Sequence, residues 1–190
     1  MRLITLVIAI SACVPTFAAE TNVRHSSGVF MVTMPDGWGW RETPGPHPNG
    51  DGASPGGEAL LHLIVAPATN DDLDAQMKLY LPLVQNRWKE AAMSGPARGT
   101  FVGRDKATIC RLVFKDQGRL QELRTVFLLR HGNVIIGVMR TEPDTAAKFE
   151  ADLREILSTV RVKPVSPPPS VPPAEQPPAV PANTGTGSKV

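Results

Sequence analysis

The side chains best suited to binding a ligand lie close together in the first third of the chain. Trp38 and Trp40 are separated only by Gly39, and His47 and Asp51 follow a few residues later. Tryptophan is enriched at binding hot spots, and an imidazole near a carboxylate can contact a polar partner or a metal ion. These two tryptophans, the histidine and the aspartate are therefore the candidate binding residues, with Trp38 expected in the core and Trp40 as a candidate exposed anchor.

The segment that carries His47 and Asp51 is unusual in composition. Nine of the 18 residues from Arg41 to Glu58 are glycine or proline, which predicts a long irregular loop. Loops of this length are usually functional or disordered. Asn49–Gly52 faintly resembles a calcium-binding loop but lacks the full set of oxygen ligands. We therefore expect no metal site and no cofactor.

The sequence contains no catalytic motif. It has no Gly-x-Ser-x-Gly elbow, no phosphate-binding glycine-rich loop and no His-Glu-x-x-His pair. His62 falls in an apolar run and is expected to be a hydrogen-bonded core histidine, while His131 fits a turn. No catalytic residue is predicted. The alternative is an enzyme whose site assembles only in three dimensions, which a cleft holding a carboxylate and two of His47, His62 and His131 would favour.

Charge and cysteine content exclude several classes of protein. Twenty Lys and Arg against 18 Asp and Glu give a net charge of +2, scattered along 190 residues, which excludes an electrostatic nucleic-acid interface. Two cysteines are too few for a zinc cage or a disulfide scaffold. Cys110 lies in an alternating apolar stretch and is expected to be an unpaired, buried, small apolar residue.

Residues 1–19 have the features of a secretory signal peptide. Arg2 is followed by an apolar run from Leu3 to Ala12, and small residues at Thr16 and Ala18 precede a cleavage site. The sequence therefore predicts a periplasmic or secreted protein. The alternative is lipidation at Cys13, within a lipobox-like Ile-Ser-Ala-Cys, which would make an outer-membrane lipoprotein facing the periplasm and the only form attached to a membrane.

The other end of the chain, residues 164–190, contains nine prolines in 27 residues. Proline lacks the amide proton that a helix or a central strand needs, so this composition predicts an extended, disordered tail. The tail is either dispensable, a spacer, or a docking segment for an envelope partner.

Residues 20–163 are expected to form a single domain. Apolar alternation and turn signals predict strands at 30–34, 60–66, 98–103, 106–115, 120–130 and 134–140. Helical spacing predicts one helix from about Asn70 to Gly95, with Pro82 inside it, and another after Pro143. In the strand 120–130, odd-numbered and even-numbered apolar residues point to opposite faces, which predicts an antiparallel sheet covered on both sides. The fold class is therefore α+β, a sheet packed with helices.

The order of these elements resembles that of the PsbP-like fold. Bacterial DcrB-type and LpqN-type envelope proteins share this plan, and the resemblance covers residues 25–162. It consists of the motif Phe30-x-Val32-x-x-Pro35-x-Gly37-Trp38, followed by a long middle helix, an antiparallel meander and a closing helix. The resemblance implies an α/β/α sandwich with a binding or assembly role and no catalysis. With the signal peptide, it predicts an exported, non-enzymatic adaptor of the bacterial cell envelope that contacts a protein or envelope partner through the Trp40–Glu58 region.

Overall fold

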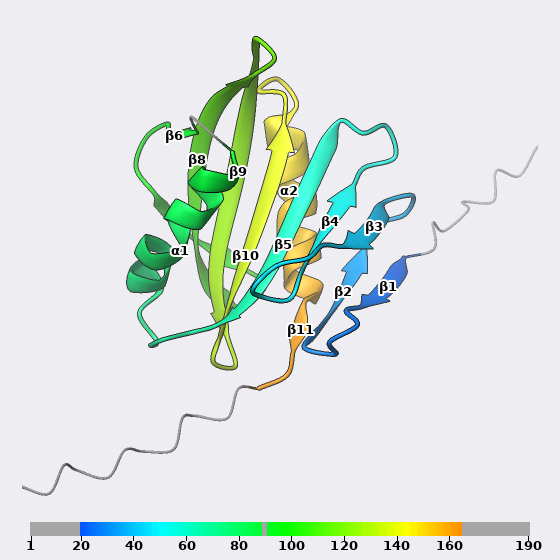
Figure 1. The fold of residues 1–190 in the computed structure, drawn as a ribbon, viewed down its shortest axis with the longest axis vertical. Helices are drawn as coiled ribbons and strands as arrows, with labels where there is room; N and C mark the ends of the chain where they lie inside the picture. Colours follow the sequence, from blue (N-terminus) through cyan, green and yellow to red (C-terminus); the bar gives the residue numbers. More distant parts are fainter. Residues whose placement is uncertain (1–19, 89–90, 165–190) are drawn as a thin grey trace, which may run out of the picture.

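The structure, a computed structural model, describes residues 20–88 and 91–164, which form two helices and two antiparallel sheets (Figure 1). The fold class predicted from the sequence, α+β, is confirmed. Within these two ranges no helix is long and apolar enough to cross a membrane. The predicted signal peptide with Cys13 and nearly all of the proline-rich tail lie outside the described residues.

The larger sheet has eight strands in the order β3-β4-β5-β10-β9-β8-β6, and β7 also pairs with β8. Its strands are β3 (Gly39–Glu42), β4 (Asn49–Ala53), β5 (Ala59–Pro67), β6 (Ala92–Met93), β7 (Arg98–Val102), β8 (Asp105–Asp116), β9 (Arg119–Arg130) and β10 (Asn133–Thr141).

The long central strands β8, β9 and β10 are joined by two tight turns. Gln117 and Gly118 form the first turn, His131 and Gly132 the second, and all four residues have positive φ. Positive φ at both central residues is the requirement of the two-residue turn that matches the twist of paired strands. His131 is thus a turn residue, as its position in the sequence predicted.

The helices cover opposite faces of this sheet. Helix α1 (Leu73–Arg87) lies on one face and α2 (Ala146–Thr159) on the other (Figure 1). The predicted division of apolar residues between the faces is confirmed. Val126 and Leu128 of β9 pack in the cluster that contains α2, whereas Leu123 and Phe127 pack in the cluster that contains α1. The apolar stripe of α2 is buried at Phe149, Leu153, Ile156 and Leu157, and Val160, which caps the helix, is buried next to it.

A smaller sheet, which the sequence analysis did not predict as a unit, adjoins α2. It has the order β1-β2-β11, formed by β1 (Thr21–Arg24), β2 (Phe30–Met34) and β11 (Arg161–Val162). Phe30, Val32 and Met34 of β2 are buried in the same cluster as α2. Strand β2 corresponds to the predicted strand 30–34. Strand β11 has only two residues, follows α2 directly and pairs with β2.

The predicted irregular loop from Arg41 to Glu58 is wrong. Arg41 and Glu42 belong to β3, and Asn49–Ala53 form β4, which pairs with β3 on one side and with β5 on the other. The glycines of β4 serve packing here. A Cβ atom on Gly50 would lie 2.2 Å from Cζ2 of Trp40, and one on Gly52 would lie 2.8 Å from Cε of Met34.

The predicted length of the middle helix is also wrong. Asp72 caps the N-terminus through its carboxylate, which accepts the amides of Asp74 and Ala75, close to the predicted start. The helix ends at Arg87 instead of continuing to Gly95. Ala92 lies in β6, where it pairs with Val113 of β8. The residues that helical spacing had assigned to the end of the helix therefore belong to the sheet.

Candidate functional site: a pocket between the sheet and the end of helix α1

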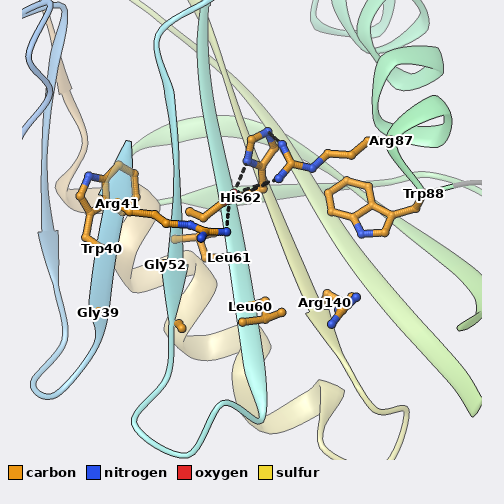
Figure 2. Close-up of a pocket in the computed structure, with 12 residues that line it drawn as sticks. Gly39, Trp40, Arg41, Gly52, Leu60, Leu61, His62, Arg87, Trp88 and Arg140 are labelled. Atoms are coloured by element: carbon orange, nitrogen blue, oxygen red, sulfur yellow. Dashed lines mark hydrogen bonds and ion pairs between the residues drawn. The ribbon is translucent and has the colours of Figure 1, made fainter. Parts of the chain in front are cut away.

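An open pocket of about 480 Å³ lies where β3, β4 and β5 meet the C-terminal end of α1 (Figure 2). Its less polar lining comes from Gly39 and Trp40 of β3, Gly52 and Ala53 of β4, and Leu60 and Leu61 of β5. Its polar rim is made by Arg41, Asp51, His62, Arg87 and Arg140, with the indole of Trp88 beside Arg87. The guanidinium carbon of Arg87 lies 5.2 Å from the Trp88 ring centre, within cation–π range.

Three of the rim residues, Asp51, His62 and Arg87, are joined by hydrogen bonds. Asp51 on β4 and His62 on β5 are directly paired in the sheet register, so their side chains project from the same face. His62 Nδ1 lies 2.7 Å from Asp51 Oδ1, and His62 Nε2 lies 2.7 Å from Arg87 Nη1. Arg87 Nη2 also donates to Asp51 Oδ1 at 3.1 Å. One sheet pair and one helix end thus hold the three side chains together.

This geometry fixes the proton on His62. A guanidinium only donates hydrogen bonds, so Nε2 of His62 must accept from Arg87. The imidazole is therefore neutral, and its proton is on Nδ1, which donates to Asp51. Both ring nitrogens are consequently used within the chain, and neither is available as a general base while Arg87 stays in place.

Burial supports the neutral form of His62. Its side chain is only 6% exposed. Desolvation is the main cause that lowers the pKa of His62 below 6.5, and the positive charge of Arg87 lowers it further, whereas the hydrogen bond to Asp51 opposes the shift. Protonation of Nε2 would also break its bond with Arg87.

We expect the stability of the protein to fall as the pH drops below 6.5, the ordinary pKa of His62. The unfolded chain takes up a proton there while the folded chain does not, so the free energy of unfolding must increase with pH in this window. Urea denaturation at several pH values will measure the slope. The variant His62→Gln should have a smaller slope than the wild type, because it lacks the imidazole that the unfolded chain protonates. An equal slope in wild type and His62→Gln would contradict this assignment.

A narrower, mainly apolar groove of about 220 Å³ adjoins the pocket. His62, Arg87 and Trp88 border both cavities. The groove runs between α1 and the segment before β4, and its other walls include Pro44, Pro46, His47, Ile64, Tyr80 and Leu83. Tyr80 is held in place because its hydroxyl donates to the carbonyl of Pro67 at 3.1 Å.

The structure places the four candidate binding residues in three different surroundings. Trp38 is buried in the cluster with α2, and Trp40 packs against the same cluster, edge-on to Phe30. Asp51 lies in the pocket, on the opposite face of the sheet from the Trp40 ring. His47 lines the apolar groove, with its ring 6.0 Å from that of Tyr80. Asp51 and His47 are thus at the two neighbouring cavities. Trp40 also borders the pocket, although its ring packs on the α2 side, and Trp38 supports the sheet from that side.

Sequence reasoning did not identify Arg87 and Trp88 as site residues. It expected His62 in the core and named it as a site residue only in the alternative of an enzyme site assembled in three dimensions. A signal was present, because residues that face each other across paired strands can be found once both strands are recognised. Recognising Asn49–Ala53 as a strand would have brought Asp51 opposite His62. The position of Arg87 depends on where α1 ends, which helical spacing alone misplaced.

The arrangement is suited to binding more than to covalent chemistry. His47 and His62 do border one groove, and Asp51 is within hydrogen-bond range of His62. However, the described residues that line the two cavities include no serine, threonine or cysteine nucleophile. Cys110 is buried elsewhere, and burial raises the pKa of its thiol to about 11. Among residues 20–88 and 91–164, no three His, Cys, Asp or Glu side chains gather as metal ligands would.

Comparison with known proteins identifies the fold. Neither the protein-family models nor the curated proteins gave a match to this sequence. Among solved structures, cyanobacterial PsbP (CyanoP) from Synechocystis is similar with a TM-score of 0.57 and 10% identity, over 81% of this chain and 99% of that one. A Bacteroides thetaiotaomicron protein gives a TM-score of 0.53 and 10% identity, over 77% of this chain and 48% of its own.

A third similar structure is LpqN, described as involved in cell envelope biogenesis of Mycobacterium tuberculosis. It has a TM-score of 0.49 and 16% identity, over 77% of this chain and 91% of its own. At these identities the likeness concerns the fold, and the cyanobacterial protein, matched over almost its whole length, carries that comparison. The chain has the PsbP-like fold that the sequence pattern predicted.

Proposed function

We propose that the protein is an exported, non-enzymatic binding or adaptor domain of the bacterial cell envelope. It contacts a protein partner through the Trp40–Glu58 region. Residues 1–19 direct export, and the proline-rich tail is a spacer. If Cys13 is lipidated instead, the same domain is tethered to the outer membrane, and fatty-acid labelling that Cys13→Ser abolishes would distinguish this form.

The observation that carries the proposal is the place of the Trp40–Glu58 region in the site. Arg41 and Asp51 from this region form part of the rim of the pocket, and Pro44 to His47 form one wall of the groove. Two parts of the region, Trp40–Glu42 in β3 and Asn49–Ala53 in β4, are hydrogen-bonded into the sheet. An arginine-bearing concave surface with tryptophan and tyrosine beside it has the composition of a protein interface.

We expect charge reversal at Arg41 to weaken partner capture about fivefold, because exposed rim charges contribute to association without supporting the fold. The Arg41 side chain is 78% exposed, and among the described residues it pairs with Asp51, at 3.4 Å. Crosslinked pull-down from native envelope, with the full chain as bait, will compare wild type, Arg41→Glu and the control Arg104→Glu. Arg104 is an exposed arginine in the turn between β7 and β8, away from both cavities.

The control should capture the partner as well as the wild type does. Equal capture by Arg41→Glu and the wild type would exclude the Trp40–Glu58 region as the contact surface. A partner lost equally from both variants would indicate a general effect of net charge.

A second candidate function is hydrolysis, which the Asp51–His62 pair favours. If a ligand anion drew Arg87 away, Nε2 of His62 would become free to activate a water molecule. In that case His62→Gln would abolish an activity that Arg41→Glu only weakens. The closed bond between His62 and Arg87 places this candidate second.

A further inference from the structure

We propose that the pocket and the groove together bind one segment of the protein partner, in which an acidic side chain lies next to a large apolar side chain. The carboxylate is held by the guanidiniums of Arg87 and Arg41, and the apolar side chain enters the groove beside Tyr80. This inference rests on the proposed function and specifies the chemistry of the partner.

Arg87 has donors left for a ligand. A guanidinium carries five N–H groups. The described contacts of Arg87, to His62 Nε2 and to the two oxygens of Asp51, occupy at most three of them. The side chain is 41% exposed at the pocket. At least two N–H groups therefore remain, on Nε and Nη1, and each can donate one charge-assisted hydrogen bond to an anionic ligand.

Asp51 cannot neutralise the pocket. Its Oδ1 atom accepts from His62 and Arg87, and its Oδ2 atom lies 3.4 Å from both Arg41 and Arg87. Three guanidiniums line the pocket, and Asp51 is the one carboxylate among the described lining residues. Asp116, 3.4 Å from Arg140, adds a second carboxylate nearby. Three positive charges against two negative charges leave an excess of one, which favours an anionic group as ligand.

The groove supplies the apolar half of the site. Its walls are mostly carbon, and its volume of about 220 Å³ suits a side chain more than a whole small molecule, since ligand pockets usually exceed about 300 Å³. Leu83 borders the groove, and Leu79 lies one helical turn before it. Both are about half exposed. Two leucines that a helix leaves to solvent beside a groove extend its apolar surface.

The contact between the two cavities sets the spacing within the ligand. Because His62, Arg87 and Trp88 border both, an acidic group in the pocket and an apolar group in the groove must be close neighbours. An extended peptide meets this requirement with residues two positions apart, since such side chains point the same way. Tryptophan, tyrosine and arginine around such a site are the residue types enriched at protein interfaces.

The test is a selection from a displayed library of random dodecapeptides on the immobilised full chain. We expect enriched peptides to carry Asp or Glu two positions away from Leu, Ile, Met or Phe. A synthetic enriched peptide should bind the wild type and Arg104→Glu equally. Its Glu→Gln or Asp→Asn analogue should bind about tenfold more weakly, the usual effect of losing one charge-assisted hydrogen-bonded pair. Arg41→Glu, an exposed position that does not support the fold, should weaken binding similarly, and Arg87→Ala should weaken it more.

Three results would overturn the inference: a pool that does not enrich, enriched peptides without an excess of acidic residues, or affinity unchanged in Arg41→Glu. Binding of phosphatidylglycerol vesicles, lost in Arg41→Glu, together with a pool that does not enrich would assign the site to anionic lipid instead. If the pull-down captures a protein through Arg41 but the peptides show no acidic preference, only this inference fails. If Arg41→Glu changes neither experiment, the proposed function fails too.

Discussion

Replacing Glu122 with alanine is expected to lower the free energy of unfolding by about 2 kcal/mol, because the change removes a buried carboxylate that accepts two charge-assisted hydrogen bonds. The Glu122 side chain is 1% exposed. It accepts from Arg111 Nη2 at 2.6 Å and from Arg124 Nε at 2.8 Å. Arg111 and Arg124 lie directly opposite each other on β8 and β9. Without Glu122 between them, two like charges would face each other across the sheet, which is destabilising.

Urea denaturation will measure the effect, with Glu122→Gln as the shape-matched comparison. The glutamine keeps one acceptor but loses the charge, so its loss of stability should be smaller. The double variant Glu122→Ala/Arg111→Ala should regain part of the loss, because it removes the repulsion along with the carboxylate. Arg124 also pairs with Glu150 of α2, so it stays partnered in every variant. A wild-type midpoint for Glu122→Ala would show that the pairing contributes nothing to stability.

Replacing Gly50 with alanine is expected to cost about 2 kcal/mol, as is usual when an extra methyl group is forced into a packed site. The new Cβ atom would lie 2.2 Å from Cζ2, 2.7 Å from Cη2 and 2.8 Å from Cε2 of Trp40. The indole is rigid and packs edge-on to Phe30, so it must swing out of its place. The environment of Trp40 should therefore change together with the stability.

Thermal or urea unfolding, followed by tryptophan fluorescence, will test this second effect. Gly39→Ala is the matched control, because a Cβ atom there has nothing within 4 Å. The double variant Gly50→Ala/Trp40→Ala should be less destabilised than the sum of the two single changes, since the indole that clashes is gone. If Gly39→Ala and Gly50→Ala cost the same, the loss comes from glycine in a strand and not from the contact with Trp40.

The periodic parts of the chain were predicted well because their pattern and their structure have the same cause. In β9, alternate residues are buried in two different apolar clusters, one under α2 and one under α1. Val126 and Phe127 are therefore both apolar although they point to opposite faces. In α2, Phe149 and Leu153 recur with the helical period because one face of the helix is buried. Patterns of this kind can be read from sequence because burial imposes them residue by residue.

The candidate site was predicted less well, since it depends on a strand that local preferences disfavour. Asn49-Gly-Asp-Gly-Ala is poor in strand-forming residues, and the composition alone suggests a loop. Its glycines are required by Trp40 and Met34, which come from β3 and β2, so the reason for the strand lies outside the segment. Unless β4 is recognised as a strand, the position of Asp51 relative to β5 is undefined, and its pairing with His62 cannot be predicted.

The two helices are attached to the sheet unequally, and this bears on how a ligand could change the molecule. Helix α2 buries Ala146, Phe149, Leu153, Ile156 and Leu157, whereas α1 buries Gln76, Tyr80 and Val84. Fewer buried apolar contacts mean that α1 separates from the sheet at a lower free energy than α2 does. A ligand that bridges Arg87 and the strands would add to this weaker attachment. Binding of the partner would therefore make local separation of α1 from the sheet less frequent, without any change in the average structure.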